Sequence, residues 1–124
     1  MRLRDISFFI STLILAAALS AALDVMAAEP GPITPEEGKA MVQQQTDLVI
    51  LDVRNPNEYV TVHYPDALNI PVNELETRLN EVPQGKPVLV HCGLGKRAQR
   101  GYEILKEKRP DIKELYYING EVIF

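Results

Sequence analysis

The residues with the clearest chemical potential lie between Val90 and Arg97, where the chain reads Val-His-Cys-Gly-Leu-Gly-Lys-Arg. Cys92, the single cysteine of the sequence, follows a short apolar run and precedes two glycines and two cations. A thiolate is a strong nucleophile, and neighbouring cations and the main-chain N–H groups at the start of a helix stabilise it. We therefore expect Cys92 to act as a nucleophile on a small anion.

The loop after Cys92 is expected to form the binding part of this site. Glycine at Gly93 and Gly95 permits positive φ angles and a close approach of the backbone to a bound group. The loop would thus surround the sulfur with main-chain donors and two cations, from Gly93, Leu94, Gly95, Lys96 and Arg97. The alternative is that Cys92 is a small apolar core residue, but the glycines, the cations and the following helix favour a functional thiol.

Strands and helices alternate along the chain in a way that positions this loop. Helices are predicted from Pro35 to about Gln44, from Pro56, over residues 73–81 and from the loop to Pro110. Strands are predicted over 48–53, 67–70, 88–90 and 114–118. Thr34, Pro35 and Glu37 form a helix start with a capping box. Residues 29–33 are expected to be an extended lead-in. This order predicts an α/β domain with a mostly parallel sheet flanked by helices.

In parallel sheets the site lies at the carboxyl ends of the strands. Asp52 and Arg54 are predicted at the exit of one central strand and Cys92 at the exit of another. We expect the Asp52–Arg54 pair to be a structural ion pair that supports the loop, with a substrate role as the less favoured interpretation.

The first 27 residues are predicted to be a signal peptide. Arg2 and Arg4 precede an apolar stretch from Ile6 to Leu23, and small residues surround Ala27. The alternative is an uncleaved membrane anchor, because the stretch approaches spanning length. We expect export to the periplasm, where an unpaired cysteine is noteworthy because exported cysteines are usually paired. The net charge of -4 gives no indication of nucleic-acid binding.

Three sequence blocks together resemble the single-domain rhodaneses, a sulfurtransferase family, of the periplasmic type. They are Leu51-Asp52-Val53-Arg54 with Pro56, Glu58 and Tyr59; the run from His63 to Pro71; and the run from Val90 to Ala98. The resemblance implies a rhodanese-like domain over residues 34–124. Three residues depart from the family pattern: Val62 and Asp66 stand where the family usually has glycines, and Ala98 stands where it usually has a hydroxyl residue.

The resemblance implies a mechanism and its partners. Cys92 would take the outer sulfur of thiosulfate and hold it as a persulfide, and cyanide or a small thiol would then remove it. No cofactor or metal is implied, and a membrane would be involved only if the signal segment is uncleaved. Two alternatives stay open: a sulfur-carrier or partner-binding module with low turnover, and a phosphatase-type site. The four residues between Cys92 and Arg97 favour sulfur over phosphate, since related phosphatases place five there.

Overall fold

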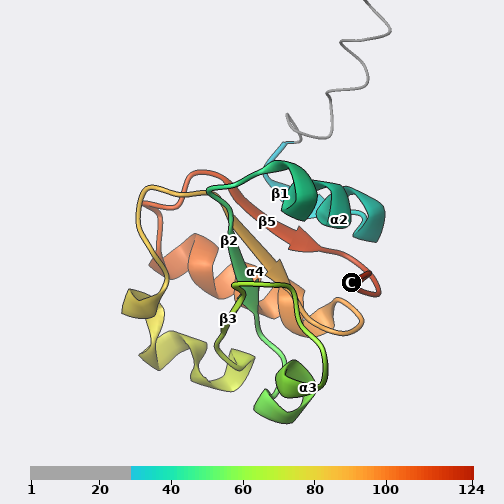
Figure 1. The fold of residues 1–124 in the computed structure, drawn as a ribbon. Helices are drawn as coiled ribbons and strands as arrows, with labels where there is room; N and C mark the ends of the chain where they lie inside the picture. The colour runs from blue at the N-terminus through green and yellow to red at the C-terminus, as the bar shows by residue number, and fades with distance from the viewer. Residues whose placement is uncertain (1–28) are drawn as a thin grey trace, which may run out of the picture.

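The computed structural model describes residues 29–124, so the predicted signal peptide at 1–27 lies outside the described residues. Five parallel strands form one sheet in the order β1-β5-β4-β2-β3, with helices on both of its faces (Figure 1). The elements in chain order are β1 (Gly31–Ile33), α2 (Pro35–Gln44), β2 (Val49–Asp52), α3 (Pro56–Thr61), β3 (Leu68–Asn69), the 3-10 helices η2 (Val72–Thr77) and η3 (Leu79–Glu81), β4 (Val88–His91), α4 (Lys96–Lys108) and β5 (Leu115–Ile118). The predicted α/β class is confirmed.

The two faces of the sheet carry separate apolar clusters. On one face, the sheet residues Leu51, Val90 and Tyr117 pack with Leu105 of α4 and Leu75 of η2. On the other face, α2 supplies Met41 to a cluster of strand residues, and α3 contributes Tyr59 to a smaller one. Alternate residues of each strand therefore serve different layers, as expected for a sheet buried on both sides.

The start of α2 follows the sequence prediction. Thr34 Oγ1 accepts a hydrogen bond from the Glu37 amide at 3.1 Å, and Glu37 Oε1 accepts one from the Thr34 amide at 3.2 Å. This capping box satisfies two main-chain donors that a helix cannot satisfy internally. Gln44, the predicted last residue of the helix, is also its observed end.

The predicted helix over residues 73–81 is wrong in type. The segment forms two 3-10 helices, and Arg78 separates them. Its buried residues are Val72 and Leu75, three positions apart, which matches the three residues per turn of a 3-10 helix. Leu79, four positions after Leu75, is only partly buried. Pro71 is the N-cap of η2.

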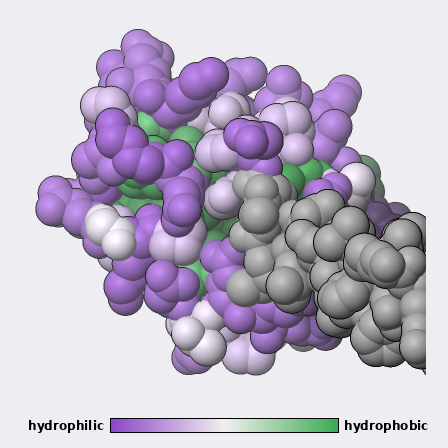
Figure 2. Space-filling model, turned by 90° about the horizontal axis from the view of Figure 1, so that it is seen from above, coloured by the Kyte–Doolittle hydropathy of each residue, from purple (hydrophilic) through white to green (hydrophobic). Residues whose placement is uncertain are grey.

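Residues 31–33 form more than the predicted lead-in, because they pair with β5 as the edge strand of the sheet. Asp66 has φ of 63°, so it adopts the left-handed conformation that favours glycine and that aspartate tolerates better than most residues. Within residues 29–124 no helix is both long and apolar enough to cross a bilayer. The face that lies uppermost in Figure 1 is mostly hydrophilic, with apolar residues visible mainly between polar ones (Figure 2).

Candidate active site

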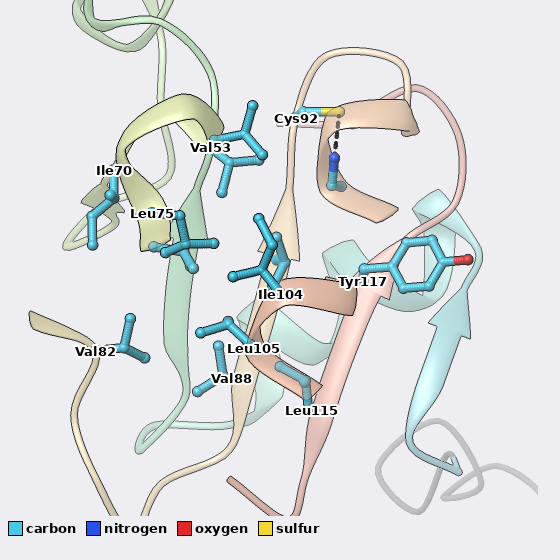
Figure 3. Close-up of a cluster of buried hydrophobic side chains, with 14 of the residues drawn as sticks. Val53, Ile70, Leu75, Val82, Val88, Cys92, Ile104, Leu105, Leu115 and Tyr117 are labelled. Atoms are coloured by element: carbon cyan, nitrogen blue, oxygen red, sulfur yellow. Dashed lines mark hydrogen bonds between the residues drawn. The ribbon is translucent and has the colours of Figure 1, made fainter. Parts of the chain in front are cut away.

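Cys92 lies directly after β4, the strand between β2 and β5, at the carboxyl edge of the sheet. Its side chain belongs to the apolar cluster beneath α4, and the residue is only 2% exposed (Figure 3). Its sulfur accepts hydrogen bonds from the main-chain amides of Gly95 at 3.0 Å and Ala98 at 3.2 Å. The sulfur thus lies among apolar side chains and is held by two main-chain donors.

The sulfur also completes the start of α4. Gly95 is the N-cap residue of this helix and has no side chain with which to cap it. The Ala98 amide is among the first N–H groups of the helix, which lack an internal acceptor. Cys92 Sγ accepts from that amide and so takes the place of a capping oxygen. The same contact exposes the sulfur to the positive end of the helix dipole.

The two loop glycines have different roles. Gly95 has φ of 113°, and a Cβ added there would lie 2.8 Å from the Gly120 nitrogen. Gly93 is not among the glycines with positive φ, so the expectation of positive φ at Gly93 is wrong. A Cβ there would meet Arg97 Nη2 at 3.5 Å, which is an ordinary contact. Only Gly95 is required by the curvature of the loop.

Arg97 is oriented by a carboxylate on α3. Its Nη1 and Nη2 donate to Glu58 Oε1 at 2.7 Å and Oε2 at 3.1 Å. The hydrogen bonds from Arg97 lower the pKa of Glu58 to about 2, and the carboxylate raises the pKa of Arg97. Glu58 Oε1 also accepts from the Asn55 amide at 3.2 Å. We predicted that the positive charge of Arg97 binds an anion, but Glu58 largely neutralises this charge. Lys96 and Leu94 of the same loop are exposed.

Glu58 was not predicted as a site residue, although its spacing after Asp52 and Arg54 belongs to the first block of the resemblance. Its three-residue distance from Asn55 indicates a helix cap, and that contact is present. The sequence does not reveal that the same carboxylate reaches across 39 positions to Arg97. One side chain therefore caps the start of α3 and binds the first turn of α4.

Asp52 and Arg54 form a buried ion pair, as predicted. Arg54 Nη2 lies 2.6 Å from Asp52 Oδ2, and the side chains are 6% and 0% exposed. Arg54 Nη2 also donates to the Val62 carbonyl at 2.7 Å, and Asn69 Nδ2 donates to the carbonyls of Asp52 and Arg54 at 2.9 and 3.0 Å. Their contacts support a structural role at the base of the site.

The two histidines lie away from the sulfur side of the sheet. His91 pairs with Asp52 in the strand register, so its side chain lies on the face opposite that of Cys92. It is fully buried, its Nε2 lies 3.7 Å from Asp52 Oδ2, and burial lowers its pKa. His63 stacks on Tyr59 with ring centroids 3.8 Å apart. Among residues 29–124 no group of three or more His, Cys, Asp or Glu is arranged to hold a metal.

The segment after β5 packs on the active-site loop, a contact that the sequence interpretation missed. The Val122 amide donates to the Gly93 carbonyl at 3.1 Å, and Gly120 approaches Gly95 closely. The Tyr64 hydroxyl donates to the carbonyl of Ile123, and the Phe124 ring centroid lies 5.0 Å from Arg54 Cζ. The tail from 119 to 124 thus links the loop to the buried ion pair.

Residues 34–121 match the family of rhodanese-like domains, and the chain therefore belongs to that family. The chain is 29% identical to a sulfurtransferase of Allochromatium vinosum over 62 residues, covering 50% of this chain and 58% of that protein. It is 35% identical to the adenylyltransferase and sulfurtransferase MOCS3 of Arabidopsis thaliana, covering 60% of this chain but 20% of that protein. It thus spans less than two thirds of both relatives.

Solved structures share the fold. Bacillus anthracis CoADR-RHD in its reduced form has a TM-score of 0.61 and 30% identity, over 74% of this chain and 16% of that one. A human single-domain sulfurtransferase has a TM-score of 0.59 and 21% identity, over 76% of this chain and 92% of that one. The rhodanese-like fold predicted from the three sequence blocks is confirmed, and relatives of the chain are named as sulfurtransferases or as a putative sulfur carrier.

Replacing Gly95 by alanine should destabilise the domain by about 1–3 kcal/mol. The backbone at this position has a positive φ that alanine disfavours, and the added Cβ would clash with Gly120. The matched change Gly93→Ala should alter the free energy of unfolding by no more than about 0.5 kcal/mol. Urea denaturation of both variants measures the difference. Equal stabilities would show that the loop does not depend on Gly95.

The Glu58–Arg97 pair should make stability depend on pH. The pKa of Glu58 falls from 4.5 to about 2 on folding, so its contribution is present above about pH 4.5 and is lost as the pH falls towards 2. Because the side chains are 36% and 35% exposed, we expect Glu58→Gln to cost about 1 kcal/mol or less at pH 7.

The measurement is the free energy of unfolding between pH 7 and pH 2. Glu58→Gln should show a weaker decline than the wild type across this range. Glu76→Gln, which removes an exposed carboxylate on η2, serves as the control and should retain the wild-type slope. A wild-type slope in Glu58→Gln would contradict the assignment.

Proposed function

We propose that this protein is a thiosulfate sulfurtransferase that works through a persulfide on Cys92. The observation that carries the proposal is the contact of Cys92 Sγ with the amides of Gly95 and Ala98. These donors favour the thiolate, which is the form of cysteine that attacks sulfur. The named sulfurtransferase among the relatives supports the same chemistry.

The transfer from donor to protein is a displacement at sulfur. The Cys92 thiolate attacks the outer sulfur of thiosulfate, forming an S–S bond to Sγ. The S–S bond of thiosulfate breaks, and sulfite leaves with its electron pair. An acceptor, either cyanide or a thiolate, then attacks the outer sulfur, and the electron pair of the broken bond returns to Sγ as thiolate. Each step conserves charge and needs no redox partner.

The loop residues contribute in distinct ways. The amides of Gly95 and Ala98 hold the sulfur in both forms, and Lys96 offers an exposed cation to the anionic donor. Arg97, paired with Glu58, is a positioning residue for the first turn of α4 rather than a free anion-binding charge. Lys96 therefore attracts the anionic donor, and Arg97 holds the first turn of α4 in position.

A sulfur carrier with low turnover is the second candidate, and the burial of Cys92 is the observation that favours it. At 2% exposure, Cys92 offers very little surface to an acceptor in solution. A carrier would accept sulfane sulfur stably but release it slowly. The four-residue spacing between Cys92 and Arg97 supports sulfur chemistry over a phosphatase in either case.

The first test is a thiosulfate–cyanide assay that compares the wild type with Cys92→Ala and Cys92→Ser. We expect thiocyanate from the wild type only, with a loss of at least about 1,000-fold in both variants, because neither side chain offers a thiolate. Mass spectrometry after exposure to thiosulfate should show an increase of about 32 Da, one sulfur atom, on Cys92. A mass increase without thiocyanate formation would favour the sulfur carrier. Equal rates of thiocyanate formation in the variants and the wild type would refute the assignment as a sulfurtransferase.

We further propose that the protein works in the periplasm. The support is the sequence of residues 1–27, with two arginines before an apolar stretch and small residues at its end. Cell fractionation of the full-length chain, expressed in a Gram-negative host, should find a shortened protein in the periplasmic fraction. Full-length protein retained in the cytoplasm would contradict this proposal.

A further inference from the structure

Four large apolar side chains of residues 29–124 are exposed in segments that adjoin the active-site loop or belong to it. They are Val60 at 75%, Val62 at 45%, Leu94 at 76% and Phe124 at 39% exposure. Leu94 lies in the loop itself, two residues after Cys92, while the others lie on α3, at its C-cap and at the end of the tail. Single exposed apolar residues are common, but a group around a reactive sulfur indicates an interaction surface.

Three of these residues, which we call the apolar rim, lie in segments joined by hydrogen bonds or by a shared contact with Arg54: Val62, Leu94 and Phe124. Arg54 Nη2 donates to the Val62 carbonyl at 2.7 Å, and the Phe124 ring lies 5.0 Å from the same guanidinium. The Val122 amide binds Gly93, which precedes Leu94. Figure 1 shows the C-terminal end beside the loop that leads into α4. The rim therefore runs from α3 across the tail to the loop.

Val60 differs from Val62 in direction. Glu58 lies on the side of α3 that faces α4, whereas Val62 is the C-cap of the helix and has an extended backbone. Val60 lies within α3, two positions after Glu58 and about 200° around the helix from it, so it points away from α4. It provides an exposed valine on the same helix for comparison.

Cations flank the rim on the side of α4. Lys96 and Arg100 are exposed and lie one helical turn apart, and neither forms an ion pair with another of residues 29–124. Arg97 between them is paired with Glu58, and Glu121 is the exposed carboxylate of the neighbouring tail. Since the whole chain has a net charge of -4, this local positive charge favours an acidic partner.

We propose that the acceptor of the Cys92 persulfide sulfur is a protein thiol: a cysteine flanked by apolar and acidic side chains on a partner that docks on the apolar rim and on Lys96 and Arg100. The inference rests on the proposed function and names its acceptor. A free hydrophilic anion or cyanide gains nothing from Leu94 or Val62, whereas an apolar partner residue buries against them.

The chemistry of this step is thiol–persulfide exchange. The partner thiolate attacks the outer sulfur on Cys92 and forms a new S–S bond there. The bond between the outer sulfur and Sγ breaks, and its electron pair remains on Sγ as thiolate, which Gly95 and Ala98 again hold. In the persulfide, the outer sulfur lies about 2 Å from Sγ.

Two synthetic peptides test the proposal. One has a cysteine flanked by leucines and glutamates; the other has the same cysteine flanked by serines and lysines. Cys92 is loaded with sulfane sulfur from inorganic polysulfide, and the peptide persulfide is followed by mass spectrometry. We expect at least about tenfold faster transfer to the acidic, apolar peptide, which corresponds to about 1.4 kcal/mol of preferential binding.

Surface variants separate docking from chemistry. Val62→Glu and Arg100→Glu should each reduce transfer to the preferred peptide about tenfold while leaving transfer to cyanide unchanged. Val60→Glu and Lys108→Glu, an exposed valine and an exposed lysine away from the rim, are the matched controls and should retain transfer to both acceptors. Arg100→Glu keeps the test informative if Val62→Glu impairs folding beside Arg54.

Three results would overturn the inference. They are equal rates with the two peptides, equal losses in the rim and control variants, or a concentration-dependent dimer that Val62→Glu dissociates, which would assign the rim to a second copy of the chain. Failure of thiosulfate to load Cys92, with polysulfide loading intact, would refute the proposed donor but not the rim. Failure of every donor would refute both.

Discussion

The structure depends on the contact between the Cys92 sulfur and two amides at the start of α4. Because Gly95 cannot cap the helix, the sulfur serves as the acceptor that the first turn requires. Local stability and reactivity therefore rely on the same atom. The geometry that completes the helix is therefore also the geometry that fixes the position of the sulfur.

The charged side chains around that sulfur lie at three different depths of burial. The Asp52–Arg54 pair lies buried at the base on the opposite face of the sheet. The Glu58–Arg97 pair is half exposed and connects α3 with α4. Lys96 and Arg100 are exposed and without a described ion pair. Charges near the core are neutralised and structural, and the cations available to ligands lie at the surface, where their desolvation costs little.

Much of this arrangement could be predicted from local sequence rules. The capping box at Thr34, the apolar run of β2 and the strand–loop–helix around Cys92 all have short-range signals, and the structure confirms them. The parts that were missed depend on long-range contacts. The bond from Glu58 to Arg97 and the packing of Gly120 on Gly95 join distant positions, and no local pattern marks them. Over residues 73–81 the sequence prediction identified a helical segment but not its 3-10 type.

The pairing of β1 with β5 has a consequence for how the chain reaches its native state. Gly31 lies beside Tyr116, so the outermost strand on this side joins residues separated by 85 positions. Contacts of such sequence separation carry a large loop-closure cost and form slowly. A nascent chain cannot complete this sheet until β5 has left the ribosome, and until then the apolar edge of β4 stays open to chaperones or to misassembly.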